Sequence, residues 1–122
     1  MSIARTFWET LEARDWAAFG AVVTDDVVAW WPQSREQVRG REALVRFMAE
    51  FPGDWHLRVE REHADDTGAA TLIAFTSGGE TVAGATFFDL AADGRVAGLT
   101  EFWPEPYDPP AGREHLAEHV PG

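Results

Sequence analysis

The alternation of hydrophobic and polar positions divides the chain into a helical first half and a strand-rich second half. Apolar residues recur at helical spacing at Ile3, Phe7 and Leu11, which predicts an amphipathic first helix. Asp15 then stands where the N-cap of a second helix is expected, and that helix would bury Phe19. Amphipathic helices of this length are not stable alone, so they need a hydrophobic surface to lie on.

The next segment is predicted to add a short strand and a third helix. Residues 24–26 are expected to end the second helix, and the apolar run 27–31 then forms the strand. The polar residues 33–40 are interpreted as a loop. The third helix is predicted over residues 41–50, with one face formed at the i, i+3, i+4, i+7 positions by Leu44, Phe47, Met48 and Phe51.

From Trp55 onward the period of the pattern changes to two, which predicts four antiparallel strands. Tight turns at residues 65–68, 78–79 and 93–94 separate them. The strand predicted over residues 80–91 carries apolar or small residues on both faces, and such strands are usually covered twice. The helices cover only one face, so we predict a homodimer through the outer face of the sheet. The alternative is a lone sheet with a mildly apolar outer face.

Composition narrows the classes of partner. The net charge is −11, with 21 acidic and 10 basic residues, and such a surface repels nucleic acid and anionic lipid. The absence of cysteine excludes disulfides and thiolate zinc sites. No apolar run reaches membrane-spanning length and no signal pattern is found, so we expect a cytoplasmic protein. At 122 residues we expect one domain, 1–122, with a proline-rich tail at 104–122.

The order of elements predicts an α+β fold, in which three N-terminal helices pack on a strongly curved, mostly antiparallel sheet. A curved sheet closed by helices at one end forms a cone-shaped barrel with an interior cavity. Three segments, FWETLEARDWAAFGAVVTDDVVAWWP, GREALVRFM and DGRVAGLTEFWP, resemble the nuclear transport factor 2-like superfamily, especially its small SnoaL-like members. The resemblance covers nearly all of the chain and implies the same fold.

The resemblance implies several chemistries, which differ in how well this sequence meets them. Ketosteroid isomerases need a tyrosine and a carboxylate base, and the matching positions hold Phe7 and Trp31. Limonene epoxide hydrolases use two acids and an arginine. Only the acid on the last strand has a counterpart in this sequence, which is Glu101. SnoaL-like cyclases use an acidic residue in a hydrophobic pocket, and this requirement Glu101 meets.

Glu101 is therefore the first catalytic candidate. It alternates with Leu99 and Trp103, so the three side chains face the same way. If that face is the interior, desolvation raises the pKa of the carboxyl group toward a range useful for acid–base catalysis. The alternatives are a structural glutamate bound to a backbone amide or to Arg46, and a glutamate on the dimer face.

Other candidates surround the expected cavity. Only one of the adjacent residues Trp30 and Trp31 can enter it, and the resemblance selects Trp31 as a flat wall for an apolar ligand. His56 titrates near neutral pH and is a weaker catalytic candidate. The ligand-binding residues expected with Trp31 are Phe7, Phe47, Trp103, Tyr107 and Arg46. Tyr107 either caps the cavity mouth or anchors the tail, and Arg46 either reaches a ligand carboxylate or lies on the surface.

One metal motif is present in the tail. His115, Glu118 and His119 match the H-x-x-E-H pattern of inverzincin metalloproteases. Only three residues follow the motif, which leaves no room downstream for a third ligand, so we interpret it as chance and expect neither metal nor cofactor.

Two functions of different class follow. The first is binding of a small apolar or aromatic, polyketide-like ligand without catalysis. The second is an isomerase, cyclase or hydrolase that uses Glu101 as general acid or base. A second polar group about 3–6 Å from Glu101 and an open channel would favour chemistry.

Overall fold

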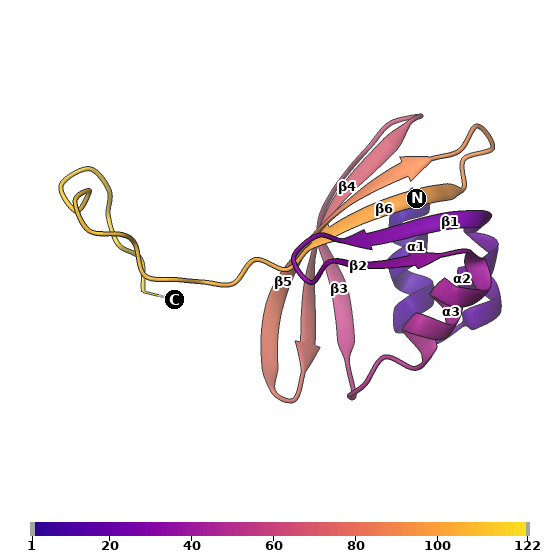
Figure 1. The fold of residues 1–122 in the computed structure, drawn as a ribbon, viewed down its shortest axis with the longest axis horizontal. Helices are drawn as coiled ribbons and strands as arrows, with labels where there is room; N and C mark the ends of the chain where they lie inside the picture. Colours follow the sequence, from indigo (N-terminus) through magenta and orange to yellow (C-terminus); the bar gives the residue numbers. More distant parts are fainter. Residues whose placement is uncertain (1, 122) are drawn as a thin grey trace.

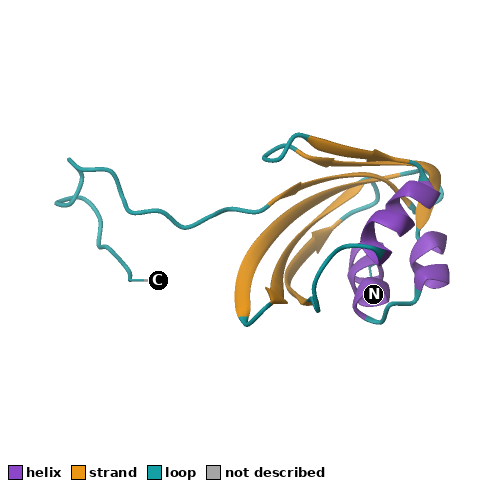
Figure 2. Ribbon diagram, turned by 60° about the horizontal axis from the view of Figure 1, so that its bottom comes forward, coloured by secondary structure: helices purple, strands orange, loops and turns teal. Residues whose placement is uncertain are grey.

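Three helices and six strands form the fold in the computed structural model, which describes residues 2–121 (Figure 1). The first and last residues of the predicted domain lie outside this range. The elements are α1 (Ile3–Glu12), α2 (Trp16–Ala21), β1 (Val23–Trp31), β2 (Glu36–Arg39), α3 (Arg41–Ala49), β3 (His56–Ala64), β4 (Gly68–Ser77), β5 (Glu80–Leu90) and β6 (Val96–Phe102). The helices lie against one face of a curved sheet, so the α+β prediction is confirmed (Figure 2).

The sheet has the strand order β2-β1-β6-β5-β4-β3. The predicted run of four antiparallel strands is confirmed as β3 to β6. β1 joins this run by pairing in parallel with β6, so the sheet is mixed. In that pairing Trp30 lies opposite Thr100, and this register brings the next residue, Trp31, beside Glu101.

Local capping explains where the first two helices begin. The Ser2 side chain accepts a hydrogen bond from the Arg5 amide at 3.1 Å, and Asp15 accepts one from Ala18 at 3.1 Å, as predicted for an N-cap. Between the helices the chain turns at Arg14, whose φ of 58° lies in the left-handed region. Each helix then directs its apolar face toward the sheet.

Two sequence predictions about the first strands are wrong. Residues 24–26 do not end a helix but lie inside β1, where the register with β6 shifts between Val23 and Val28. This irregularity keeps the acidic residues outside, and Asp25 forms an ion pair with Arg41 at 2.6 Å. Residues 33–40 are not only a loop, because they contain β2. Its polarity hid it, since an edge strand exposed to solvent needs no apolar face.

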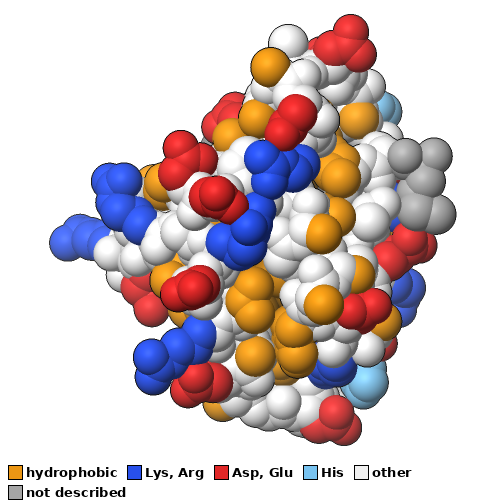
Figure 3. All heavy atoms as spheres, turned by 90° about the vertical axis from the view of Figure 1, so that its right-hand side faces the viewer, with side chains coloured by type: hydrophobic (Ala, Val, Ile, Leu, Met, Phe, Trp, Pro, Cys, Tyr) orange, Lys and Arg blue, Asp and Glu red, His pale blue; other side chains and the backbone are white. Residues whose placement is uncertain are grey.

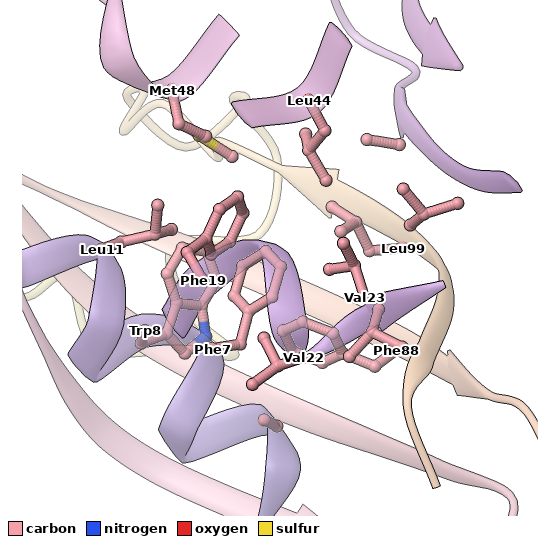
Figure 4. Close-up of a cluster of buried hydrophobic side chains, with 14 of the residues drawn as sticks. Phe7, Trp8, Leu11, Phe19, Val22, Val23, Leu44, Met48, Phe88 and Leu99 are labelled. Carbon is pink, nitrogen blue, oxygen red and sulfur yellow. The ribbon is translucent and has the colours of Figure 1, made fainter. Parts of the chain in front are cut away.

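The core is densest where α1 and α2 meet the sheet (Figure 4). Phe7 is fully buried there, and its ring lies 4.9 Å from Trp8, 4.9 Å from Phe19 and 5.1 Å from Phe88 between centroids. All three contacts are edge-on, the arrangement that aromatic pairs prefer. This cluster attaches both helices to β5.

The chain beyond β6 leaves the sheet and extends away from the helices (Figure 1). Its residues 104–121 are all exposed, including those that form short turns. Over residues 2–121, no helix has the length and apolar character needed to cross a membrane. Seen from the side of the helices, acidic and basic side chains are interspersed around a hydrophobic patch (Figure 3).

Candidate functional site

A pocket of about 60 Å³ lies between α1, α3 and the inner face of the sheet. Seven of its twelve lining residues are aromatic, and Glu101 is the one titratable residue among them. The lining consists of Trp8, Leu11, Trp31, Phe47, Met48, Phe51, Trp55, Leu57, Ile73, Phe75, Glu101 and Trp103. The pocket is therefore an aromatic enclosure around a single carboxyl group.

A row of polar side chains crosses the inner face of the sheet beneath this pocket. Thr71 lies directly opposite Thr86, and Thr86 lies opposite Glu101, on β4, β5 and β6. All three are buried, with at most 5% of each residue exposed. The Thr86 hydroxyl donates a hydrogen bond to Oε2 of Glu101, and the Trp31 indole donates one to Oε1 at 2.9 Å. Both carboxyl oxygens thus have a partner inside the protein.

The surroundings of Glu101 change its acidity. Burial raises the pKa of this carboxyl group above its ordinary value of 4.5, while the hydrogen bonds from Thr86 and Trp31 and the nearby Trp103 side chain only partly oppose the rise. The structure therefore favours the neutral acid over the carboxylate, compared with an exposed glutamate. This is the environment predicted for an acid–base group, and it is equally suited to a neutral hydrogen-bonding anchor.

The aromatic side chains form a continuous wall. Trp31 stacks on Phe47 with centroids 4.7 Å apart and ring planes inclined by 26°. On the opposite side, Trp55 stacks on Phe75 at 6.0 Å, and Phe75 meets Trp103 edge-on at 5.3 Å. Flat apolar walls of this kind suit a planar or alicyclic ligand.

Trp103 can lie against the sheet because residue 84 on β5 is a glycine. A Cβ atom at Gly84 would lie 2.7 Å from Cζ3 of Trp103, which is closer than two carbon atoms can approach. The Trp103 amide also donates a hydrogen bond to Oε1 of Gln33. These contacts hold the last residue before the tail at the edge of the pocket.

The structure brings together four of the residues singled out from the sequence. Trp31, Phe47, Glu101 and Trp103 all line the pocket. Glu101 faces the interior, as its alternation suggested, and the alternatives of a bond to Arg46 or a place on the outer face are wrong. Trp30 lies on the opposite face and is 36% exposed, as expected for the neighbour of Trp31.

Four other candidates lie away from this pocket. Phe7 packs into the core, because its face of α1 is turned toward α2 and β5. The Arg46 side chain is 79% exposed and pairs with Glu50 at 2.8 Å. Tyr107 is 82% exposed within the tail, and the exposed His56 side chain points to Glu12. For Arg46 the surface alternative therefore holds, whereas the expectation that Phe7 lines the pocket is wrong.

The sequence analysis did not single out Thr71 and Thr86 of the polar row, or Trp8, which lines the pocket. The Trp8 indole donates a hydrogen bond to the Thr71 hydroxyl at 2.9 Å, and both groups are buried. Thr86 shares a strand face with Gly84 and Phe88, so a threonine at an inward position was the available signal. Buried hydroxyls are normally hydrogen-bonded, and such a position therefore indicates a polar partner across the sheet.

The described residues offer no metal centre. Within residues 2–121 no group of three or more His, Asp or Glu side chains is arranged to hold a metal ion. His115, Glu118 and His119 are exposed in the tail, His115 in a turn and the other two in irregular chain, and none lies on a helix. The zinc-protease pattern therefore lacks the helix that would present its ligands.

Comparisons with known proteins place this geometry among relatives. The sequence model of the SnoaL-like domain matches residues 4–99. A protein of Kribbella flavida DSM 17836, provisionally named a ketosteroid isomerase, is 44% identical with a TM-score of 0.92, covering 98% of this chain and 88% of that one. An NTF-2-like protein of unknown function from Burkholderia xenovorans LB400 is 21% identical with a TM-score of 0.80, covering 98% and 93%.

A third solved structure is more distant in sequence. RV0760c from Mycobacterium tuberculosis is 18% identical with a TM-score of 0.70, covering 84% of this chain and 91% of that one. At this identity the likeness concerns the fold alone. None of the curated proteins matches the sequence.

Proposed function

This chain belongs to the SnoaL-like domain family and has its nuclear transport factor 2-like fold, and from that premise we propose that it binds a small apolar or aromatic, polyketide-like ligand. The observation that carries the proposal is the pocket, where seven aromatic side chains surround one buried carboxyl group. Ligand sites are typically apolar with a few placed polar groups, and this pocket follows that pattern. The structure of RV0760c, a complex with estradiol-17beta-hemisuccinate, supports an apolar ligand for this fold.

The size of the pocket bears on how a ligand enters. Its volume of about 60 Å³ equals roughly two water molecules, whereas sites for drug-sized ligands span about 300–1,000 Å³. A larger ligand therefore requires side chains to move outward. Phe51, which is 40% exposed just after α3, and Trp103, which precedes the tail, are the wall residues best placed to do so. In this proposal their movement opens the cone-shaped interior expected from the sequence.

The carboxyl group of Glu101 and the absence of basic residues in the lining restrict the charge of the ligand. Each oxygen of Glu101 has one partner within the protein, so each keeps a lone pair for a ligand hydroxyl or amide. The neutral acid can also donate its proton to a ligand carbonyl. No basic side chain is among the twelve lining residues, so an anionic ligand would lack a counter-charge. We expect a neutral ligand with a hydroxyl or carbonyl group.

Assembly is part of the same proposal. The outer face of the sheet carries exposed apolar side chains at Trp30, Phe87 and Phe102. We propose that residues 1–122 act as a single domain that pairs with a second copy through this face, as the sequence pattern of β5 predicted. Covering exposed phenylalanine is the physical reason.

A second candidate function is general acid–base catalysis by Glu101. The raised pKa of its buried carboxyl group favours this alternative, as does the provisional name of the Kribbella protein. Against it, the lining holds no second titratable group to share the proton transfer, and Phe7 lies in the core at the position where isomerases carry their tyrosine. The balance therefore favours binding.

Matched small molecules separate these possibilities. Titration with 2-naphthol, followed by quenching of tryptophan fluorescence, should give saturable binding, and 2-naphthoate should bind at least about tenfold more weakly, because its charge would be buried without a partner. Glu101→Gln should keep naphthol affinity within about threefold, since the amide retains hydrogen-bonding capacity. Absence of saturable binding to both molecules would refute the proposal.

The catalytic alternative has its own assay. An unconjugated β,γ-unsaturated 3-ketosteroid is incubated with the protein, and formation of the conjugated enone is followed by its ultraviolet absorbance. Turnover that falls at least about a hundredfold in Glu101→Gln would establish acid–base catalysis at this residue. Turnover that is unchanged in the variant would exclude it.

A further inference from the structure

A second group of linked side chains lies outside the pocket, where the end of α1 meets the start of β3. We call Glu12, Arg14 and His56 the α1–β3 clamp. His56 lies more than forty residues along the chain from Glu12 and Arg14, yet Glu12 contacts both of the others, and Glu12 and Arg14 contact the backbone of the 55–57 segment. Trp55 and Leu57, on either side of His56, line the pocket.

Glu12 holds two successive residues of this segment at once. Its Oε1 accepts a hydrogen bond from the Leu57 amide at 2.9 Å, and its Oε2 lies 2.8 Å from Nδ1 of His56. A carboxylate with both oxygens engaged on neighbouring residues restrains the start of β3 in position and in direction. The inward direction of Leu57 follows from this restraint, because adjacent strand residues face opposite sides.

Arg14 holds the other wall residue from outside. Its guanidinium lies 3.6 Å from the centre of the Trp55 ring, and Nη2 donates a hydrogen bond to the Trp55 carbonyl. Nη1 donates to the carbonyls of Leu11 at 3.1 Å and Glu12 at 3.2 Å, which anchors the same side chain to the end of α1. Trp55 is only 4% exposed and stacks on Phe75 inside the pocket.

The backbone conformation of Arg14 is a second observation that favours a specific role for this side chain. Its φ of 58° lies in the region that glycine and asparagine adopt most readily, and another side chain there carries a conformational cost. The cation over Trp55 and the three carbonyl contacts offset that cost. Glycine would relieve it but would leave the Trp55 ring without its outer partner.

We propose that Glu12, Arg14 and His56 are positioning residues of the ligand pocket, which hold Trp55 and Leu57 against the ligand from the protein surface, and that protonation of His56 tightens this hold. The proposal rests on the ligand-binding function proposed above. It assigns to three surface residues a control over affinity that none of them exerts by touching the ligand.

The pH dependence has a defined window. His56 faces Glu12 on α1, Asp54 at 3.4 Å from Nε2, and the charge of Arg14. The hydrogen bond and charge of Glu12 raise the pKa of His56 above 6.5, although the Arg14 charge opposes this. Burial works against ionisation of Glu12, but its bonds to His56 and Leu57 outweigh burial and lower its pKa below 4.5. The clamp is thus fully formed between pH 4.5 and 6.5, loosens as pH rises through the raised pKa of His56, and loosens again as pH falls through the lowered pKa of Glu12.

The first test uses the protein without ligand. Nuclear magnetic resonance should show the Leu57 amide and the Trp55 indole titrating together, with the midpoint of the His56 imidazole and above pH 6.5. Both titrations should disappear in His56→Gln and persist in His63→Gln, a matched histidine on the same strand. If the Leu57 and Trp55 signals do not follow His56 in the wild-type protein, the pH-dependent hold is refuted.

The second test measures affinity for 2-naphthol. Wild-type affinity should fall about two- to fivefold between pH 6 and pH 8, the range typical of an exposed ion pair, and should stay flat in His56→Gln. Arg14→Ala should weaken binding about fivefold or more, with partial rescue in Arg14→Lys, while Arg58→Ala, an exposed arginine of β3, should change nothing.

The outcomes distinguish the two proposals. If wild-type protein binds neither naphthol nor naphthoate, the ligand-binding function fails, and the resonance titration alone decides whether the clamp holds Trp55 and Leu57. If the wild-type protein binds naphthol and Arg14→Ala binds it equally well, the clamp proposal fails and the binding function stands. Glu12→Gln serves in place of Arg14→Ala should that variant not fold, and it should likewise weaken binding and shift the midpoint of His56 toward 6.5.

Discussion

Four residues of the β5–β6 pair, two on each face, reverse the polarity of an ordinary half-buried sheet. On the inner face, Thr86 and Glu101 are 0% and 3% exposed. On the outer face, their sequence neighbours Phe87 and Phe102 are 55% and 37% exposed and lie edge-on to each other at 6.5 Å. Antiparallel sheets with one solvated face normally place apolar residues inside and polar residues outside. Here a threonine and a carboxyl group are inside, and two phenylalanines are outside.

The buried carboxyl group and the exposed phenylalanines are both unfavourable placements, and they differ in whether the chain itself supplies a compensating contact. The buried carboxyl group of Glu101 finds its partners, Thr86 and Trp31, within the chain, and its raised pKa favours the neutral form. The exposed rings of Phe87 and Phe102 contact each other but are not covered by residues 2–121. The polar partners of Glu101 thus lie within one chain, whereas the exposed phenylalanines form the surface through which we propose that two copies pair.

The largest effect is expected from breaking the inner polar row. Glu101→Ala leaves the Thr86 hydroxyl and the Trp31 indole buried without a partner and opens a cavity, so the free energy of unfolding should fall by roughly 2–4 kcal/mol. Urea denaturation measures this change. Thr100→Ala, on the other face of the same strand, is the control and should cost less than about 1 kcal/mol. Equal losses in the two variants would show that the inner row has no special role.

The next effect is expected on the outer face, where Phe87→Glu tests association instead of folding. The variant should keep the unfolding free energy of the monomer within about 1 kcal/mol, because the ring is more than half exposed. Sedimentation equilibrium should show the dimer dissociation constant rising at least about thirtyfold, as for a central interface residue. Phe87→Leu should retain most of the association. A wild-type protein that remains monomeric at high concentration would contradict the dimer.

The smallest effect is a pH dependence that isolates the buried acid. The pKa of Glu101 is raised by folding, so its neutral form is favoured in the native state and stability contributed by the acid is present below pH 4.5. That stability is lost as pH rises through the raised pKa, with a slope of at most about 1.4 kcal/mol per pH unit. Glu101→Gln lacks this titration, so its stability relative to the wild-type protein should increase with pH in urea denaturation. A constant difference between the two would mean that the carboxyl group titrates normally.

Sequence reasoning succeeded where the signal was local. The helices beginning after Asp15 and at Arg41, and the strands from His56 to Phe102, follow from spacing and turn residues and were found close to their observed bounds. It failed at β2, which is an exposed edge strand with no apolar alternation, and at residues 24–26, where acidic side chains sit in an irregular part of β1. In both places pairing with a distant strand, which no local pattern records, overrides the polar composition.

For the candidate site, the sequence predicted which elements carry the residues better than it predicted where each side chain points. The alternation of Leu99, Glu101 and Trp103 placed Glu101 on the same face as two apolar side chains, and the observed carboxyl group is indeed buried with them. Phe7 and Trp8 are adjacent on α1, yet only Trp8 reaches the pocket. Successive residues on a helix point about 100° apart. The orientation of α1 on the sheet therefore decides which of these two side chains faces the core and which faces the pocket.

The sequence by itself determined most of the elements, their order and the family, and it placed Glu101 on one face with Leu99 and Trp103, because periodicity, turn residues and alternation are properties of short segments. Only the tertiary structure decided that Trp31 and Thr86 hydrogen-bond to Glu101. It likewise decided that the His56 side chain contacts Glu12 and does not line the pocket. These contacts join residues 15 to 70 positions apart, and they depend on the parallel register of β1 with β6 and on the packing of α1 against β3. Hydrogen bonds act over about 3 Å, so only the assembled sheet could bring their partners within reach.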